Sequence, residues 1–123
     1  MKKSNQMNDL KHLFRLIRFK NLMIIVSIQL LIKFCIVNQF VDNYSLNWIE
    51  FLLYLTATIT IVAAGYIIND IYDIEADLIN KKNDVLVNKY INEKKAYKYY
   101  FIFNLTGIVC GLILSLLLKK IYL

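Results

Sequence analysis

The sequence predicts an all-α integral membrane protein, a bundle of three membrane-spanning helices. Of its 123 residues, 59% are hydrophobic, whereas soluble domains average about 45–50%. The excess gathers in three blocks, which we place at about 22–41, 48–68 and 99–118. Each block reaches the roughly 20 residues that a helix needs to cross the hydrocarbon core of a bilayer. The chain has no proline and only three glycines, so little interrupts such helices.

The charge distribution predicts how this single membrane domain, residues 1–123, sits in the bilayer. Basic side chains concentrate in two segments: Lys2, Lys3, Lys11, Arg15, Arg18 and Lys20 before the first block, and Lys81, Lys82, Lys89, Lys94, Lys95 and Lys98 before the third. The connection 38–47 has no Lys or Arg. Because short basic segments stay cytoplasmic, we expect a cytoplasmic N-terminus and a cytoplasmic loop at about 69–98, in the inner or plasma membrane if the protein is bacterial.

The segment before the first block has the pattern of a helix that lies among lipid headgroups. Leu10, Leu13, Phe14 and Ile17 repeat at helical spacing, and basic residues occupy the rest of the wheel. A cleaved signal peptide is the competing interpretation. The long polar lead and the interruption of the apolar block by Lys33 disfavour it.

Composition excludes several other classes of protein. The chain has a net charge of +6, but its basic residues do not form a separate basic domain, so nucleic acid is not an expected partner. Attraction to anionic lipid headgroups accounts for the basic residues better. Cys35 and Cys110 both fall inside apolar blocks, where neither a disulfide framework nor a metal site is expected.

Two features inside the blocks bear on helix packing. Lys33 either faces a partner helix or polar cavity, or extends outward to the membrane surface. Gly107 and Gly111 form a GxxxG pattern in the third block, which is typical of closely packed membrane helices.

Oxygen-bearing side chains gather where the second block ends. They are Asn69, Asp70, Asp73, Asp77 and Asn80. On a continuous helix, at about 100° per residue, all five share an arc of roughly 100°. Glu75 falls on the opposite side of the same helix.

This arrangement predicts a site for Mg²⁺. Like charges at these spacings repel one another, and the cost rises near lipid, so a cation should compensate. Hard oxygen ligands suit Mg²⁺, which keeps waters and commonly bridges carboxylates to phosphate oxygens. We expect a Mg²⁺–diphosphate site that opens from the bilayer to the cytoplasm and accepts a lipid-tailed diphosphate. The alternative is a solvated acidic loop balanced by Lys81, Lys82 and Lys89.

The motif Asn69-Asp70-x-x-Asp73-x-x-x-Asp77 is similar to the first aspartate-rich motif of the UbiA family of membrane prenyltransferases. Its surroundings agree with that resemblance. The segment Arg18-Phe-Lys-Asn21 resembles the Arg-x-x-Asn segment of the family, and the small residues Ala63-Ala-Gly65 precede the motif as they do there. Asn80-Lys81 resembles the asparagine that follows the family motif.

The resemblance implies an intramembrane helical enzyme that transfers an isoprenoid chain to an acceptor. The motif aspartates would bind Mg²⁺ and the diphosphate of the donor, whose departure leaves an allylic cation for the acceptor to attack. By that analogy Asp73 and Asp77 hold the metal, and Asn69 and Asp70 assist. The side chains expected to bind the diphosphate are Asn69, Lys81, Arg18, Asn21 and Asn80. Lys82 and Lys89 are alternatives to Lys81 as substitutes for the basic residue of the family.

The sequence departs from the family pattern in two ways. In the loop after the motif, Lys82 stands where the family has proline, Asp84 stands where it has a basic residue, and Asn88 and Lys89 stand near a family glycine. The chain also matches only the first third of the family fold and contains no second aspartate-rich motif.

Three hypotheses follow from the missing half of the site. The first is the N-terminal part of a truncated or split prenyltransferase, inactive alone, with the missing C-terminal portion as its partner. The second is a small non-catalytic membrane protein that binds partners or cations. The third is a complete site built from further copies of this chain.

Overall fold

A computed structural model describes the backbone of residues 2–37, 46–80 and 85–119, with side chains for all of these except 2–7, 37, 77, 78 and 80. The elements in chain order are α1 (Lys2–Leu16), α2 (Phe19–Leu31), the π-helical segment η1 (Ile32–Val37), α4 (Trp48–Tyr72), α5 (Ile74–Asn80) and α6 (Glu93–Lys119). No β-strand occurs within these described ranges.

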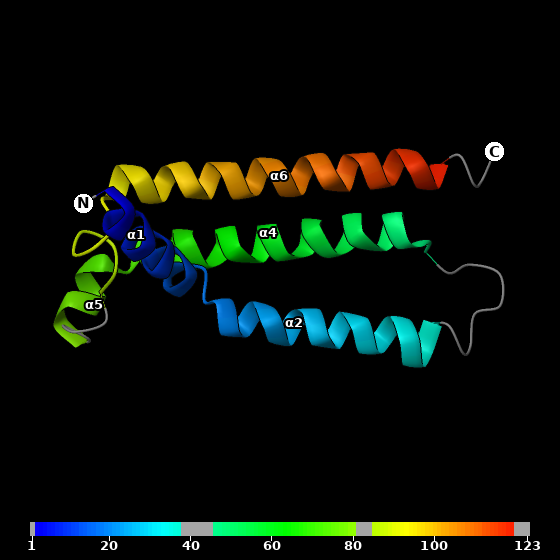
Figure 1. Cartoon of the computed structure of the whole chain (residues 1–123), viewed down its shortest axis with the longest axis horizontal. Helices are drawn as coiled ribbons and strands as arrows, with labels where there is room; N and C mark the ends of the chain where they lie inside the picture. Colours follow the sequence, from blue (N-terminus) through cyan, green and yellow to red (C-terminus); the bar gives the residue numbers. More distant parts are fainter. Residues whose placement is uncertain (1, 38–45, 81–84, 120–123) are drawn as a thin grey trace.

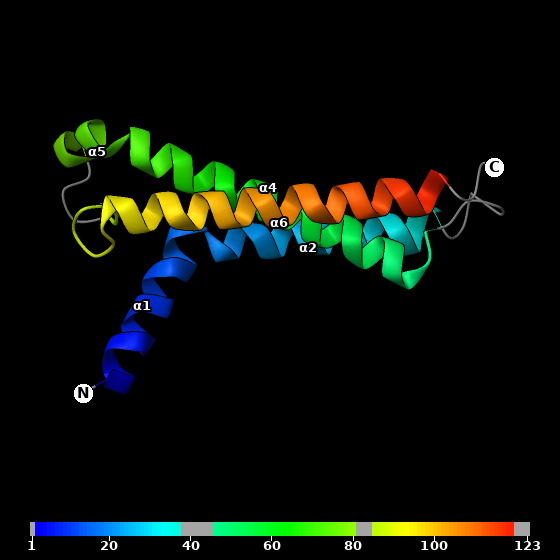
Figure 2. The same ribbon diagram turned by 90° about the horizontal axis from the view of Figure 1, so that it is seen from above.

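Three long helical rods run side by side: α2 with η1, then α4, then α6 (Figure 1). The segments Phe19–Ile36, Trp48–Tyr72 and Glu93–Lys119 are each long and apolar enough to cross a membrane. The predicted all-α bundle with three spans is therefore confirmed. The helices α1 and α5 lie at the same end of the bundle, which we call the motif end (Figure 2). There α1 leaves the bundle at an oblique angle.

The helices α4 and α6 form the most extensive contact in the bundle. Gly107 of α6 makes this close approach possible, because a Cβ atom there would lie 2.7 Å from Ile61 Cγ1 and 2.8 Å from Thr60 Oγ1. Thr60 Oγ1 is itself held, since it donates to the Thr56 carbonyl at 2.8 Å. The predicted packing role of the GxxxG pattern thus applies to Gly107, whereas a Cβ at Gly111 would meet nothing within 4 Å.

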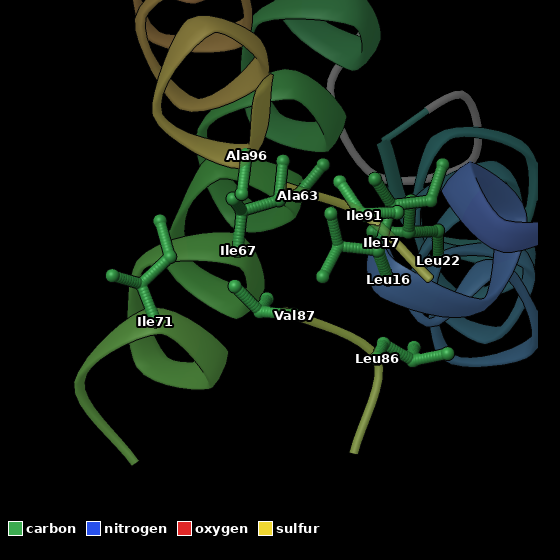
Figure 3. Packing of buried hydrophobic residues seen from close by; sticks show 10 residues of the cluster. All are labelled: Leu16, Ile17, Leu22, Ala63, Ile67, Ile71, Leu86, Val87, Ile91 and Ala96. Carbon is green, nitrogen blue, oxygen red and sulfur yellow. The ribbon is translucent and has the colours of Figure 1, made fainter. Parts of the chain in front are cut away.

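The buried hydrophobic core lies at the motif end (Figure 3). Its members come from α1, the junction that follows it, α2, α4, the segment before α6, and α6. They are Leu16, Ile17, Leu22, Ala63, Ile67, Ile71, Leu86, Val87, Ile91 and Ala96. The segment 85–91 thereby packs against both α1 and α4. Along the rest of the spans many large apolar side chains are exposed, as expected for helices that face hydrocarbon.

A tight turn shapes the segment 85–91. Asn88 has a φ of 68°, its N–H donates to the Ile91 carbonyl at 2.8 Å, and the Tyr90 N–H donates to the Leu86 carbonyl at 2.9 Å. Asparagine is one of the few non-glycine residues that tolerate this left-handed conformation. Asn88 therefore adopts a backbone conformation suited to glycine, close to where the family pattern has one.

We expect Asn88→Gly to leave the stability of the bundle nearly unchanged and Asn88→Val to lower it by about 1–2 kcal/mol. A β-branched residue in the left-handed region meets its own carbonyl, whereas glycine does not. Thermal unfolding of the two variants in the same detergent measures the difference. Equal melting temperatures for glycine and valine would show that the turn does not adopt this conformation.

Lys33 lies in η1 near the other end of the bundle and is only 8% exposed. Its Nζ donates to the Leu46 carbonyl at 2.6 Å and lies 4.7 Å from the ring centroid of Phe51 and 5.4 Å from that of Trp48. Aromatic faces attract an ammonium group. Lys33 therefore finds its partners at the start of α4, where Asn47 and Glu50 cap the helix reciprocally.

Candidate metal and diphosphate site

The last turn of α4 presents the amide and carboxylate side chains that the sequence singled out. Asn69 and Asp70 lie within the helix, and Asp73 ends it with φ −87° and ψ 6°. The Asp73 N–H still donates to the Asn69 carbonyl at 2.9 Å, after which α5 begins at Ile74.

The helix expected to be continuous from Asn69 to Asn80 is therefore interrupted at Asp73. The common arc calculated for five side chains holds only as far as the break. A physical reason lies in the like charges: on a continuous helix Asp70, Asp73 and Asp77 would stand three and four residues apart on one face and repel one another. The break leaves Asp70 and Asp73 at the C-terminus of α4, whose last turn contains no basic residue.

Two carboxylates at this break each have a polar partner. Asn69 Nδ2 donates to Asp73 Oδ2 at 2.8 Å, across one helical turn. Arg18 Nη2 donates to Asp70 Oδ1 at 3.0 Å, and the two side chains are 44% and 18% exposed. A charge-assisted pair of this geometry fixes the orientation of the carboxylate. The structure thus places Arg18 against Asp70 and Asn69 against Asp73 at the end of α4.

Arg18 reaches Asp70 because of the junction between α1 and α2. Its backbone is left-handed, with φ 50° and ψ 54°, a conformation that costs a non-glycine residue about 1–2 kcal/mol. The Arg18 carbonyl accepts the Asn21 N–H at 2.8 Å and so starts α2. The guanidinium also lies 5.0 Å from the ring centroid of Tyr66. Packing around the junction therefore holds Arg18 against α4 despite the backbone strain.

The remaining predicted site residues are placed less completely. Asn21 lies in the first turn of α2 with an exposed side chain. Asp77 and Asn80 lie in α5, but their side chains are outside the described residues. Lys81 is outside the described residues altogether, as are Lys82 and Asp84.

The described residues fit a metal that is shared with phosphate better than one caged by protein. No group of three potential metal ligands among His, Cys, Asp and Glu occurs in the part of the chain that is described. Asp70 and Asp73 supply two carboxylates, and Mg²⁺ is typically held by one or two carboxylates together with substrate phosphates. The donor set is thus compatible with Mg²⁺ once a diphosphate contributes further oxygens.

Sequence reasoning missed Tyr66, which supports the guanidinium of Arg18. A signal was present, because Tyr66 precedes Asp70 by four residues and such pairs share one face of a helix. An aromatic ring beside a carboxylate on that face is a suitable platform for an arginine.

Comparison with known proteins identifies the family. The model of the UbiA prenyltransferase family matches residues 30–122. A digeranylgeranylglyceryl phosphate synthase of Methanocaldococcus jannaschii is 34% identical over 110 residues, which are 89% of this chain and 37% of that protein. A digeranylgeranylglyceryl phosphate synthase of Sulfurisphaera tokodaii is 38% identical over 68 residues, which are 55% of this chain and 24% of that protein.

The chain therefore spans well under half the length of these curated relatives. No solved structure matches it significantly. The family match covers all three candidate spans in whole or in part, together with the aspartate motif. The chain belongs to the UbiA prenyltransferase family.

Proposed function

We propose that this chain binds Mg²⁺ and the diphosphate of an isoprenoid donor at the motif end, as one half of a prenyltransferase site. The observation that carries the proposal is the convergence of Arg18 with Asp70 beside the Asn69–Asp73 pair. These carboxylates destabilise a helix terminus, an arrangement that a bound cation would offset.

The side chains have separate tasks in this proposal. Asp70, Asp73 and Asp77 supply carboxylate oxygens, and Asn69 orients Asp73 through its amide N–H. Arg18 has a planar fork of donors suited to phosphate, and Asn21, Asn80 and Lys81 lie near enough in sequence to add further contacts. Mg²⁺ supplies neutralisation of the negative charge on the departing diphosphate.

The substrate class follows from the membrane and from the relatives. A donor with an apolar tail matches a site at the end of membrane-spanning helices. The relatives are named for a product that carries two geranylgeranyl groups on glyceryl phosphate, which favours a geranylgeranyl donor and a prenylated glyceryl phosphate as acceptor. Transfer to the acceptor also needs a polypeptide that corresponds to the rest of those longer relatives, or further copies of this chain. The basic residues around the motif favour a cytoplasmic orientation for this end and for the N-terminus.

Metal removal tests the proposal. In nanodiscs, the chain should bind farnesyl diphosphate in the presence of Mg²⁺, and EDTA should weaken that binding at least about tenfold, since the charge on the diphosphate then lacks its counterion. Calorimetry against empty nanodiscs corrects for partition into lipid.

Farnesol serves as the control, because it keeps the tail and lacks the phosphates. It should show no dependence on Mg²⁺. Binding of farnesyl diphosphate that EDTA leaves unchanged would instead favour the non-catalytic membrane protein.

A further inference from the structure

The inner face of α1 is held against the bundle by polar and aromatic contacts. Asp9 Oδ2 accepts a hydrogen bond from Lys95 Nζ of α6 at 2.7 Å. The ring of His12 stacks on Tyr90, with centroids 4.6 Å apart and an interplanar angle of 13°. Leu16 is fully buried in the core. The orientation of α1 about its own axis is therefore fixed.

The outer face of α1 combines exposed apolar and basic side chains. Leu10 is 54% exposed and Phe14 is 42% exposed. Lys11 and Arg15, which are also exposed, lie beside them at about 100° per residue. Asp9 is directed to Lys95, so the side chains described on this outer face carry only positive charge.

This outer face continues the lipid-facing surface of the first span. Phe14 packs edge-on against Phe19, with ring centroids 4.9 Å apart, and Phe19 begins the candidate span. One turn further along α2, Met23 is 46% exposed. Because α1 leaves the bundle obliquely at the end of this span (Figure 2), its outer face lies where the span emerges from hydrocarbon.

We propose that the outer face of α1 binds the anionic lipid headgroups of the membrane surface. Leu10 and Phe14 enter the boundary between headgroups and acyl chains, as amphipathic interfacial helices do. Lys11 on this face and Lys20, which is exposed in the first turn of α2, pair with lipid phosphates. Each basic residue near such a surface adds about 1 kcal/mol, or about fivefold, to the preference for anionic lipid. This inference does not depend on the prenyl diphosphate site.

Site-specific fluorescence in vesicles tests this interaction. A Cys35→Ser/Cys110→Ser background carries a single environment-sensitive label at Leu10→Cys. In phosphatidylcholine vesicles that contain phosphatidylglycerol, quenchers attached to lipid should suppress the label, and iodide in the water should not. In pure phosphatidylcholine the ratio of quenching by iodide to quenching by the lipid-attached quencher should rise severalfold. Lys11→Gln/Lys20→Gln should produce the same shift without removing phosphatidylglycerol.

A label at Glu93→Cys is the matched control, because Glu93 is exposed at the same end of the bundle but lies outside α1. It should remain accessible to iodide in both lipids. If the lipid-attached quencher suppressed the label at position 10 equally in both lipids, the proposal would be overturned, because insertion of apolar side chains alone would explain the result. A label at position 10 that is shielded from both quenchers would also overturn it, because a protein segment would then cover this face.

Discussion

Replacing Asp73 by alanine should weaken Mg²⁺-dependent binding of farnesyl diphosphate by about a hundredfold, equivalent to about 2.7 kcal/mol. Asp73 is the exposed carboxylate at the break between α4 and α5, and its partner Asn69 orients it. Removing it takes away one of the two described carboxylates of the proposed metal site. Calorimetry in nanodiscs at saturating Mg²⁺ measures the change.

Glu75→Ala is the control for this experiment. Glu75 is also an exposed acid, two residues further along the chain in the first turn of α5, so its loss changes the net charge equally. Farnesyl diphosphate should bind the Glu75 variant with nearly wild-type affinity. Equal losses in the two variants would mean that general negative charge, and not a metal-binding position, governs the interaction.

The substitution Gly107→Ala should destabilise the bundle by about 1–3 kcal/mol, the typical cost of overpacking a well-packed interface. The new methyl group would meet Ile61 and Thr60 at 2.7–2.8 Å. Ile61 has a branched and stiff side chain, and the hydroxyl of Thr60 is held by the carbonyls of its own helix. The Ile61 side chain or the spacing of α4 and α6 must therefore shift, and denaturation of the chain in mixed micelles would detect the loss of stability.

Gly111→Ala provides the comparison within the same GxxxG pattern. Nothing lies within 4 Å of a Cβ at that position, and alanine favours a helix over glycine by about 0.5–1 kcal/mol. We expect this variant to be as stable as the wild type or more so. A loss of stability at both glycines would show that another helix packs against Gly111.

The bundle could be predicted from sequence because hydrophobic length alone defines a membrane-spanning helix. The length of an apolar block does not indicate which residues of neighbouring helices contact each other. The pattern at Gly107 and Gly111 treats the two glycines alike, but only Gly107 meets α4. The partners of Lys33 could not be predicted either, because the position of the Leu46 carbonyl, which accepts its hydrogen bond, depends on how α4 begins.

The sequence indicated which residue types make up the candidate site, but it indicated their geometry only in part. Residue types and spacing indicated carboxylates for a metal, and the family resemblance added Arg18 from far along the chain. The break at Asp73 was not predicted, because a helical wheel assumes a regular backbone. The pairing of Arg18 with Tyr66 depends on a left-handed junction that no local propensity favours for arginine.

Electron paramagnetic resonance with Mn²⁺ in place of Mg²⁺ tests most directly whether the carboxylates of α4 hold a metal that is shared with a diphosphate. With farnesyl diphosphate present, the wild-type chain should bind Mn²⁺ and show hyperfine coupling to ³¹P. The variant Asp70→Asn/Asp73→Asn, which keeps the shape of both side chains, should lose the bound signal. Bound Mn²⁺ without ³¹P coupling, or an unchanged signal in the double variant, would contradict this assignment.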